Sequence, residues 1–78
     1  MHLEIITPEK KIYTGEVNMV NLPGSEGSFG ILENHAPIIS TLQQGKIVVR
    51  ELNNTEKTFE VKGGVMEMSN NKIIVLAE

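Results

Sequence analysis

Apolar residues along this chain recur with a period of two more often than with the period of a helix. Leu3 and Ile5 are one such pair, and Met66 and Met68 are another. Successive side chains of a strand point to opposite faces, so this alternation is typical of strands that bury one face. The pattern predicts eight short strands, near residues 2–7, 12–22, 28–33, 38–42, 46–52, 57–62, 64–69 and 72–77.

Turn residues separate these runs and leave little room for a helix. The pairs Asn53-Asn54 and Asn70-Asn71 each lie between two strand-like runs, and asparagine tolerates the left-handed backbone angles of tight hairpins. Two antiparallel hairpins are therefore expected, one joining 46–52 to 57–62 and the other joining 64–69 to 72–77.

The Gly63-Gly64 pair marks a change of facing. Phe59 and Val61 are odd-numbered, whereas the apolar positions after the glycines are even-numbered. An extra residue is needed at this point, so we expect a bulge or tight reversal with at least one glycine at positive φ.

The alternation also predicts which side chains fill the interior. One domain of 78 residues is expected, an all-β fold built as a flattened sandwich or barrel of about eight to ten short, mostly antiparallel strands. Met19 is also interpreted as core filling, and Leu32 as returning to the core. The other expected core residues are Leu3, Ile5, Phe29, Ile31, Leu42, Phe59, Val61, Met66, Met68 and Val75.

The amino-acid composition limits the classes of partner that this chain can bind. Seven Lys and Arg against ten Asp and Glu give a net charge of −3, the wrong sign for binding a nucleic-acid backbone. The only aromatic residues, Tyr13, Phe29 and Phe59, offer few stacking platforms to an oligonucleotide-binding barrel. There is no cysteine, which fits a reducing compartment and excludes a thiolate metal site. The longest apolar run, five residues, is too short to cross a bilayer, so membrane contact is expected only through a partner.

The glycine-rich stretch 22–38 suggests two kinds of site, a nucleotide-binding loop and an active site, and the sequence argues against both. Its glycines are spaced Gly-x-x-Gly-x-x-Gly between strands, unlike the dinucleotide fingerprint between a strand and a helix, and Glu26 would repel a phosphate. Ser25 and Ser28 lack the Gly-x-Ser-x-Gly elbow of a nucleophile. His35 has no partner at ligand spacing, and the only other histidine, His2, is expected on a strand surface. No catalytic residue, cofactor or metal is expected, and the stretch is interpreted as a loop shaped for contact.

The same stretch resembles the epsilon subunit family of the rotary, F-type ATP synthase. The resemblance is carried by Leu-Pro-Gly-Ser-Glu-Gly-Ser-Phe-Gly-Ile-Leu at 22–32 and by His-Ala-Pro at 35–37. It continues through Leu42 and Gly45, and then through Val-x-Gly-Gly-Val-Met-Glu-Met at 61–68 to Val-Leu-Ala-Glu at 75–78. It therefore covers essentially the whole chain.

The resemblance implies a non-catalytic rotor subunit of the central stalk, which couples proton or sodium flow to ATP synthesis. It places Glu26, Gly27 and Ser28 against the c ring, although Ser28 stands where many members carry a carboxylate. It also implies a peripheral location at the cytoplasmic face of the bacterial inner membrane. The residues that it places at the gamma subunit are Thr7, His35, Ala36, Pro37 and Ser40.

The family fold is a ten-stranded sandwich that most members follow with a C-terminal helical hairpin. This sequence stops at Glu78, so the hairpin, its inhibition of hydrolysis and its ATP site are expected to be absent, with a naturally short subunit favoured over a trimmed one. The alternative is a free-standing β-sandwich module that binds a different protein.

Overall fold

The computed structural model describes residues 1–78 and contains eight strands and no helix. The predicted all-β fold is confirmed, at the lower end of the expected number of strands. The chain has no helix of the length and apolar character that crossing a membrane requires. The strands are β1 (His2–Ile6), β2 (Lys11–Gly24), β3 (Gly27–Leu32), β4 (Ile38–Leu42), β5 (Gly45–Glu51), β6 (Glu56–Val61), β7 (Gly64–Ser69) and β8 (Lys72–Ala77).

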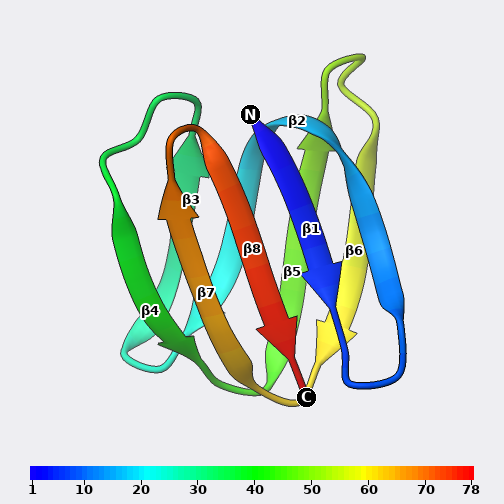
Figure 1. Cartoon of the computed structure of the whole chain (residues 1–78), viewed down its shortest axis with the longest axis vertical. Coiled ribbons are helices and arrows are strands. Elements are labelled where there is room, and N and C mark those ends of the chain that lie inside the picture. The colour runs from blue at the N-terminus through cyan, green and yellow to red at the C-terminus, as the bar shows by residue number, and fades with distance from the viewer.

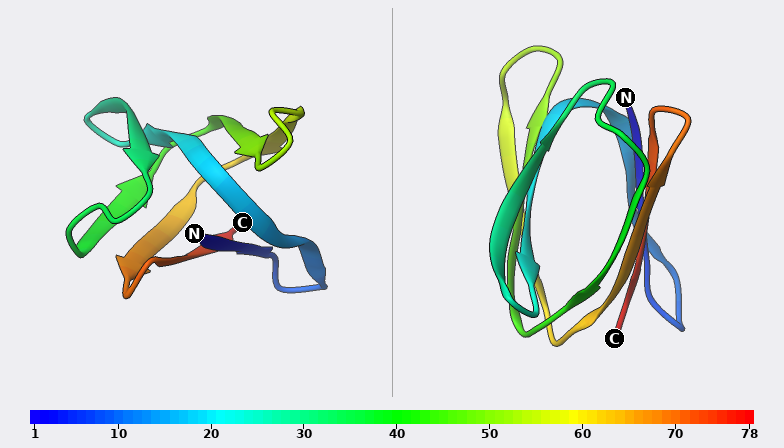
Figure 2. Two further views of the ribbon diagram at one scale, coloured as in Figure 1. Left: turned by 90° about the horizontal axis from the view of Figure 1, so that it is seen from above. Right: turned by 90° about the vertical axis from the view of Figure 1, so that its left-hand side faces the viewer.

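The strands form a sandwich of two layers that share β2. The first half of β2 pairs with β1, which continues through β8 and β7 to β4. The second half of β2 pairs with β3 and β5, and β5 pairs with β6. Figure 1 shows the first layer in front, and the right-hand view of Figure 2 shows the two layers edge-on. All pairings are antiparallel except that of β1 with β8, which is parallel.

A bulge inside β2 changes which side chains face the core. The register with β5 shifts between Val17 and Met19, and one extra residue there reverses the alternation. Val17 and Val20 are consequently both fully buried. Met19 is only half-buried, so its assignment to the core is wrong, because the sequence does not reveal the bulge.

The two predicted hairpins are confirmed. The β5–β6 ladder runs from Gly45↔Val61 to Arg50↔Glu56, and the β7–β8 ladder ends at Ser69↔Lys72. Both turns place asparagine at positive φ, with φ of 67° at Asn54 and 52° and 59° at Asn70 and Asn71.

The glycine pair after β6 carries the chain from one layer to the other. Gly63 and Gly64 have φ of 149° and 146°, so the expected positive φ is confirmed. The pair is a crossing between layers and not an insertion in one ladder, because β6 pairs only with β5 and β7 pairs with β4 and β8. This explains why the facing of the apolar residues changes here.

Besides Met19 and Leu32, ten residues are predicted to lie in the core, and eight of these ten are among the seventeen buried residues that fill the space between the layers. Phe29 and Phe59 are the two exceptions, since both are only partly buried and pack against the edge of the core. Phe59 contacts the Tyr13 ring at a centroid distance of 5.3 Å. Leu32 is 64% exposed, so its predicted return to the core is wrong; it is the last residue of β3, where Ile31 takes the inward position.

Candidate functional site

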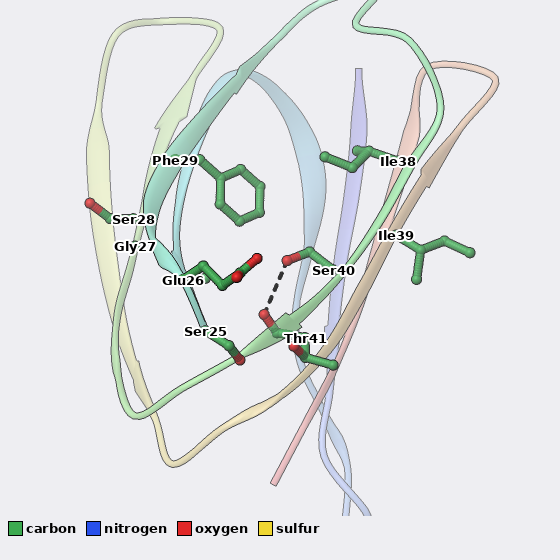
Figure 3. Close-up of a pocket in the computed structure, with 10 residues that line it drawn as sticks. Ser25, Glu26, Gly27, Ser28, Phe29, Ile38, Ile39, Ser40 and Thr41 are labelled. Atoms are coloured by element: carbon green, nitrogen blue, oxygen red, sulfur yellow. Dashed lines mark hydrogen bonds between the residues drawn. The ribbon is translucent and has the colours of Figure 1, made fainter.

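A groove opens on the side of the sandwich where β3 and β4 face each other. It has a volume of about 380 Å³ and is lined by residues 24–29 and 38–41. Figure 3 shows Phe29 and Ile38 directed into it, and Glu26 and Ser40 reaching in from opposite sides, while Ile39 points away. Glu26 is the only charged residue of the lining. The floor is thus apolar and aromatic, and the rim is a glycine-rich hairpin and an uncharged strand.

The groove exists because both strands beside it are edge strands. β3 pairs only with β2, and β4 pairs with β7 along its whole length but with β2 only at Gly24↔Leu42. Two backbone bonds close the narrow end of the groove, from Ser25 N–H to the Thr41 carbonyl at 3.0 Å and from Gln43 N–H to the Pro23 carbonyl at 2.9 Å. Above them the two strands diverge.

The expected c-ring residues and one expected gamma residue meet in this groove. Glu26, Gly27 and Ser28 form its hairpin rim, and Ser40 lies opposite on β4. Gly27 has φ of 129°, and a Cβ built there would touch nothing within 4 Å, so its hairpin is open to solvent. The Ser40 hydroxyl donates to the Thr41 carbonyl at 3.0 Å.

The remaining expected gamma residues lie elsewhere. Figure 1 places the β3–β4 loop, which holds the exposed His35, Ala36 and Pro37, at the end of the sandwich opposite the β1–β2 and β2–β3 turns. The structure therefore connects 35–37 to Ser40 through β4, but it separates Thr7 from them. The Thr7 hydroxyl donates to the Lys10 carbonyl at 3.0 Å and so closes the β1–β2 turn.

Sequence reasoning missed several residues of the groove lining. Phe29 was assigned to the core, and Ile38, Ile39 and Thr41 were given no role. The available signal was the composition of the two strands, because neither β3 nor β4 contains a charged residue. Exposed edge strands usually carry charges that discourage pairing with other chains.

An aromatic and acidic cluster lies on the other side of the molecule. The Tyr13 hydroxyl donates to Glu51 Oε2 at 2.6 Å, and Lys57 Nζ lies 3.3 Å from the same oxygen. Burial, and then the hydrogen bond to Glu51, raise the pKa of Tyr13 to about 12. This phenol stays protonated at neutral pH and ties β2 to β5.

His2 is held between two carboxylates on the outer face of β1 and β2. Its Nδ1 lies 2.7 Å from Glu16 Oε2 and its Nε2 lies 3.0 Å from Glu4 Oε2. The hydrogen bonds to Glu16 and then to Glu4 raise the pKa of His2 above its usual value, and the bond to His2 lowers the pKa of Glu4.

These shifts predict a pH-dependent stability. A raised folded pKa means that the contribution of His2 is complete below about pH 6.5, its ordinary value, and is lost as the pH rises through the folded pKa. The lowered pKa of Glu4 has the opposite sign, because its contribution is lost as acid protonates the carboxylate. Thermal melts of the wild type and of His2→Gln should differ most at mildly acidic pH and converge at alkaline pH. A constant difference across this range would contradict the expectation.

The fold and the groove define a small β-sandwich domain with a surface suited to contact with another protein. All 78 residues match the family described as ATP synthase, Delta/Epsilon chain, beta-sandwich domain, and the chain belongs to this family.

Individual relatives agree with this assignment. The ATP synthase epsilon chain of Caulobacter vibrioides is 41% identical over 78 residues, which cover 100% of this chain and 90% of the relative. The ATP synthase epsilon chain of Maridesulfovibrio salexigens is 47% identical over 76 residues, but these cover only 53% of it. Relatives therefore differ widely in how far they extend beyond the matched domain.

Solved structures share the fold. A chain of the mitochondrial ATP synthase of Euglena gracilis, solved with OSCP, F1 and the c ring, superposes with a TM-score of 0.90 at 17% identity. The match covers 96% of this chain and 48% of that one. A chain from the central stalk and c ring of the Tetrahymena thermophila enzyme gives 0.81 at 20% identity, over 99% and 62% of the two chains.

Proposed function

We propose that this chain is a non-catalytic rotor subunit of an F-type ATP synthase, and that it links the gamma subunit to the c ring. In this role it couples proton or sodium translocation to ATP synthesis at the cytoplasmic face of the bacterial inner membrane. The observation that carries the proposal is the family match over all 78 residues, with relatives named ATP synthase epsilon chain.

The hairpin between β2 and β3 is assigned as the contact with the c ring. Glu26, Gly27 and Ser28 project at one end of the sandwich, and all three are exposed. A glycine-rich hairpin allows a neighbouring backbone to approach closely, and the Glu26 carboxylate can pair with basic residues of a polar loop. Both properties support a contact with the polar loops of the ring.

The surface that runs from the β3–β4 loop into β4 is assigned as the contact with the gamma subunit. His35, Ala36 and Pro37 are exposed and Ser40 lines the groove, so these four can belong to one continuous contact. Thr7 is still assigned to gamma through the family resemblance. This assignment requires a second region of contact with gamma, at the other end of the sandwich.

Single cysteines test both assignments, because the chain has none of its own. In the assembled synthase, Ser28→Cys should crosslink to subunit c and His35→Cys should crosslink to gamma. The Thr7→Cys variant tests the separate gamma contact in the same way. Subunit-specific antibodies on denaturing gels identify each product.

Thr58→Cys on the exposed edge of β6 is the control for these crosslinks and should give neither product. If the Ser28 and His35 variants both fail in an enzyme that retains the chain, the proposed orientation is wrong. If the chain does not assemble with gamma and the c ring at all, the alternative of a free-standing module that binds another protein gains support.

A further inference from the structure

Three strands of the sandwich have an open edge: β3, β4 and β6. The edges of β4 and β6 are protected very differently. β6 pairs only with β5, and it carries Glu56, Lys57 and Glu60. Charges on an edge strand discourage pairing with another chain. β4 has the sequence Ile-Ile-Ser-Thr-Leu and carries no charge, although most of its second edge has no partner strand. The chain therefore protects the edge of β6 and leaves the edge of β4 competent to pair.

The direction of the β4 backbone groups follows from the hydrogen bonds at its end. The Thr41 carbonyl accepts from Ser25 and therefore points away from β7. In a strand the groups of residues i and i+2 point to the same edge, so Ile39 also presents its N–H and carbonyl to the groove. Three groups on this edge have no partner strand: the N–H and carbonyl of Ile39 and the N–H of Thr41.

The side chains around this edge define what could pair there. A strand laid along β4 would place one set of side chains on the groove floor, beside Phe29 and Ile38. Its other set would lie beside Ile39, whose side chain is 70% exposed on the outer face. Glu26 is the only charge of the groove lining, and Glu67 lies opposite Ile39 on β7. Both carboxylates disfavour an acidic residue in a strand laid along β4. The fitting occupant is an extended segment without acidic residues, rich in apolar or β-branched side chains.

We propose that β4 binds an extended segment of its partner by β-strand addition, with hydrogen bonds to the backbone of Ile39 and Thr41. The inference rests on the proposed function, in which the partner along β4 is the gamma subunit. Main-chain bonds give affinity in this mode of recognition, and the pockets for alternate side chains give specificity. It predicts that loss of a backbone donor, and not of a side chain, weakens the complex.

A proline scan against the purified gamma subunit of the same synthase tests the inference. Thr41→Pro removes the outward N–H but leaves the β4–β7 ladder intact, because proline is tolerated where the strand N–H faces outward. Leaving a partner carbonyl unpaired should weaken binding at least about tenfold. Thr41→Val keeps the N–H and should bind within about twofold of the wild type. Calorimetric titration measures the three affinities.

Thr58→Pro on β6 is the matched control. The Glu51 N–H donates to the Thr55 carbonyl at 2.9 Å, so the odd residues of β6 face β5 and Thr58 presents its N–H to the free edge. This variant makes the same chemical change on the charged edge and should bind gamma as the wild type does. Equal losses in both proline variants would overturn the inference.

Hydrogen exchange of the wild type provides a readout that does not depend on a variant folding. The amides of Ile39 and Thr41 should exchange fast in the free chain and slowly in the complex, while the Thr58 amide stays fast in both. Gamma binding without protection at Ile39 and Thr41 would refute strand addition but keep the proposed function. Absence of gamma binding would instead refute the function. A dimer of the isolated chain that Thr41→Pro dissociates would make a second copy the occupant and overturn the inference.

Discussion

Ile73→Ala should remove a large part of the stability of this domain. Ile73 lies in β8, is fully buried, and pairs with Leu3 on one side and Met68 on the other. Truncating a buried isoleucine leaves a cavity and costs about 2–5 kcal/mol, against a total of roughly 4–12 kcal/mol for a chain of this length. Chemical denaturation should show the midpoint falling while the slope stays the same.

Ile39→Ala is the control for that experiment, because it deletes the same atoms from a side chain that is 70% exposed. Its free energy of unfolding should stay within about 0.5 kcal/mol of the wild type. Phe59→Ala should cost less than the full burial of a phenylalanine suggests, since this ring lies at the edge of the core. Equal effects of Ile73→Ala and Ile39→Ala would mean that the assigned facing of β4 or β8 is wrong.

Gly64→Ala should be as damaging as the core truncation, for a different reason. A Cβ at this position would overlap the carbonyl oxygen of Leu76 in the neighbouring strand β8. The φ of 146° is also one that residues with a side chain rarely adopt. Strain of this kind alone costs about 1–3 kcal/mol, so a total of about 3 kcal/mol is expected once the overlap is included. The melting temperature should fall by roughly 10–20 °C.

Gly30→Ala separates this effect from the general cost of replacing glycine. A Cβ there would lie 3.8 Å from Asn21 Nδ2, an ordinary contact, and the backbone of Gly30 needs no positive φ. Its melting temperature should stay close to that of the wild type. A similar loss in both variants would show that the layer crossing at Gly64 is not the cause.

The local sequence pattern predicts the strands well, because the period-two alternation of apolar and polar residues lies within each strand. It failed at β2, which was expected over 12–22 and extends to Gly24. The strand continues through Pro23, which lacks an N–H but whose carbonyl accepts a bond from Gln43. The inner bulge of β2 likewise depends on its pairing with β5, which no local pattern encodes.

The groove could not be predicted from the sequence in the same way. Its two walls are separated along the chain by the β3–β4 loop, and its shape depends on β3 and β4 pairing with different neighbours. Glu26, Gly27 and Ser28 are named in advance only because the family resemblance assigns them to an interface, and the structure places them on the groove rim. Phe29 and Thr41 belong to the groove only through the tertiary arrangement.

The membership of β2 in both layers has a mechanical consequence. Two sheets held together only by apolar side chains can shear past each other, because such contacts have little directionality. Here one covalent strand of 14 residues passes from the β1 ladder into the β3 and β5 ladders, so sliding of one layer over the other would strain this strand and break its hydrogen bonds. A force applied at the β2–β3 hairpin is therefore transmitted along the main chain of β2 into the opposite layer.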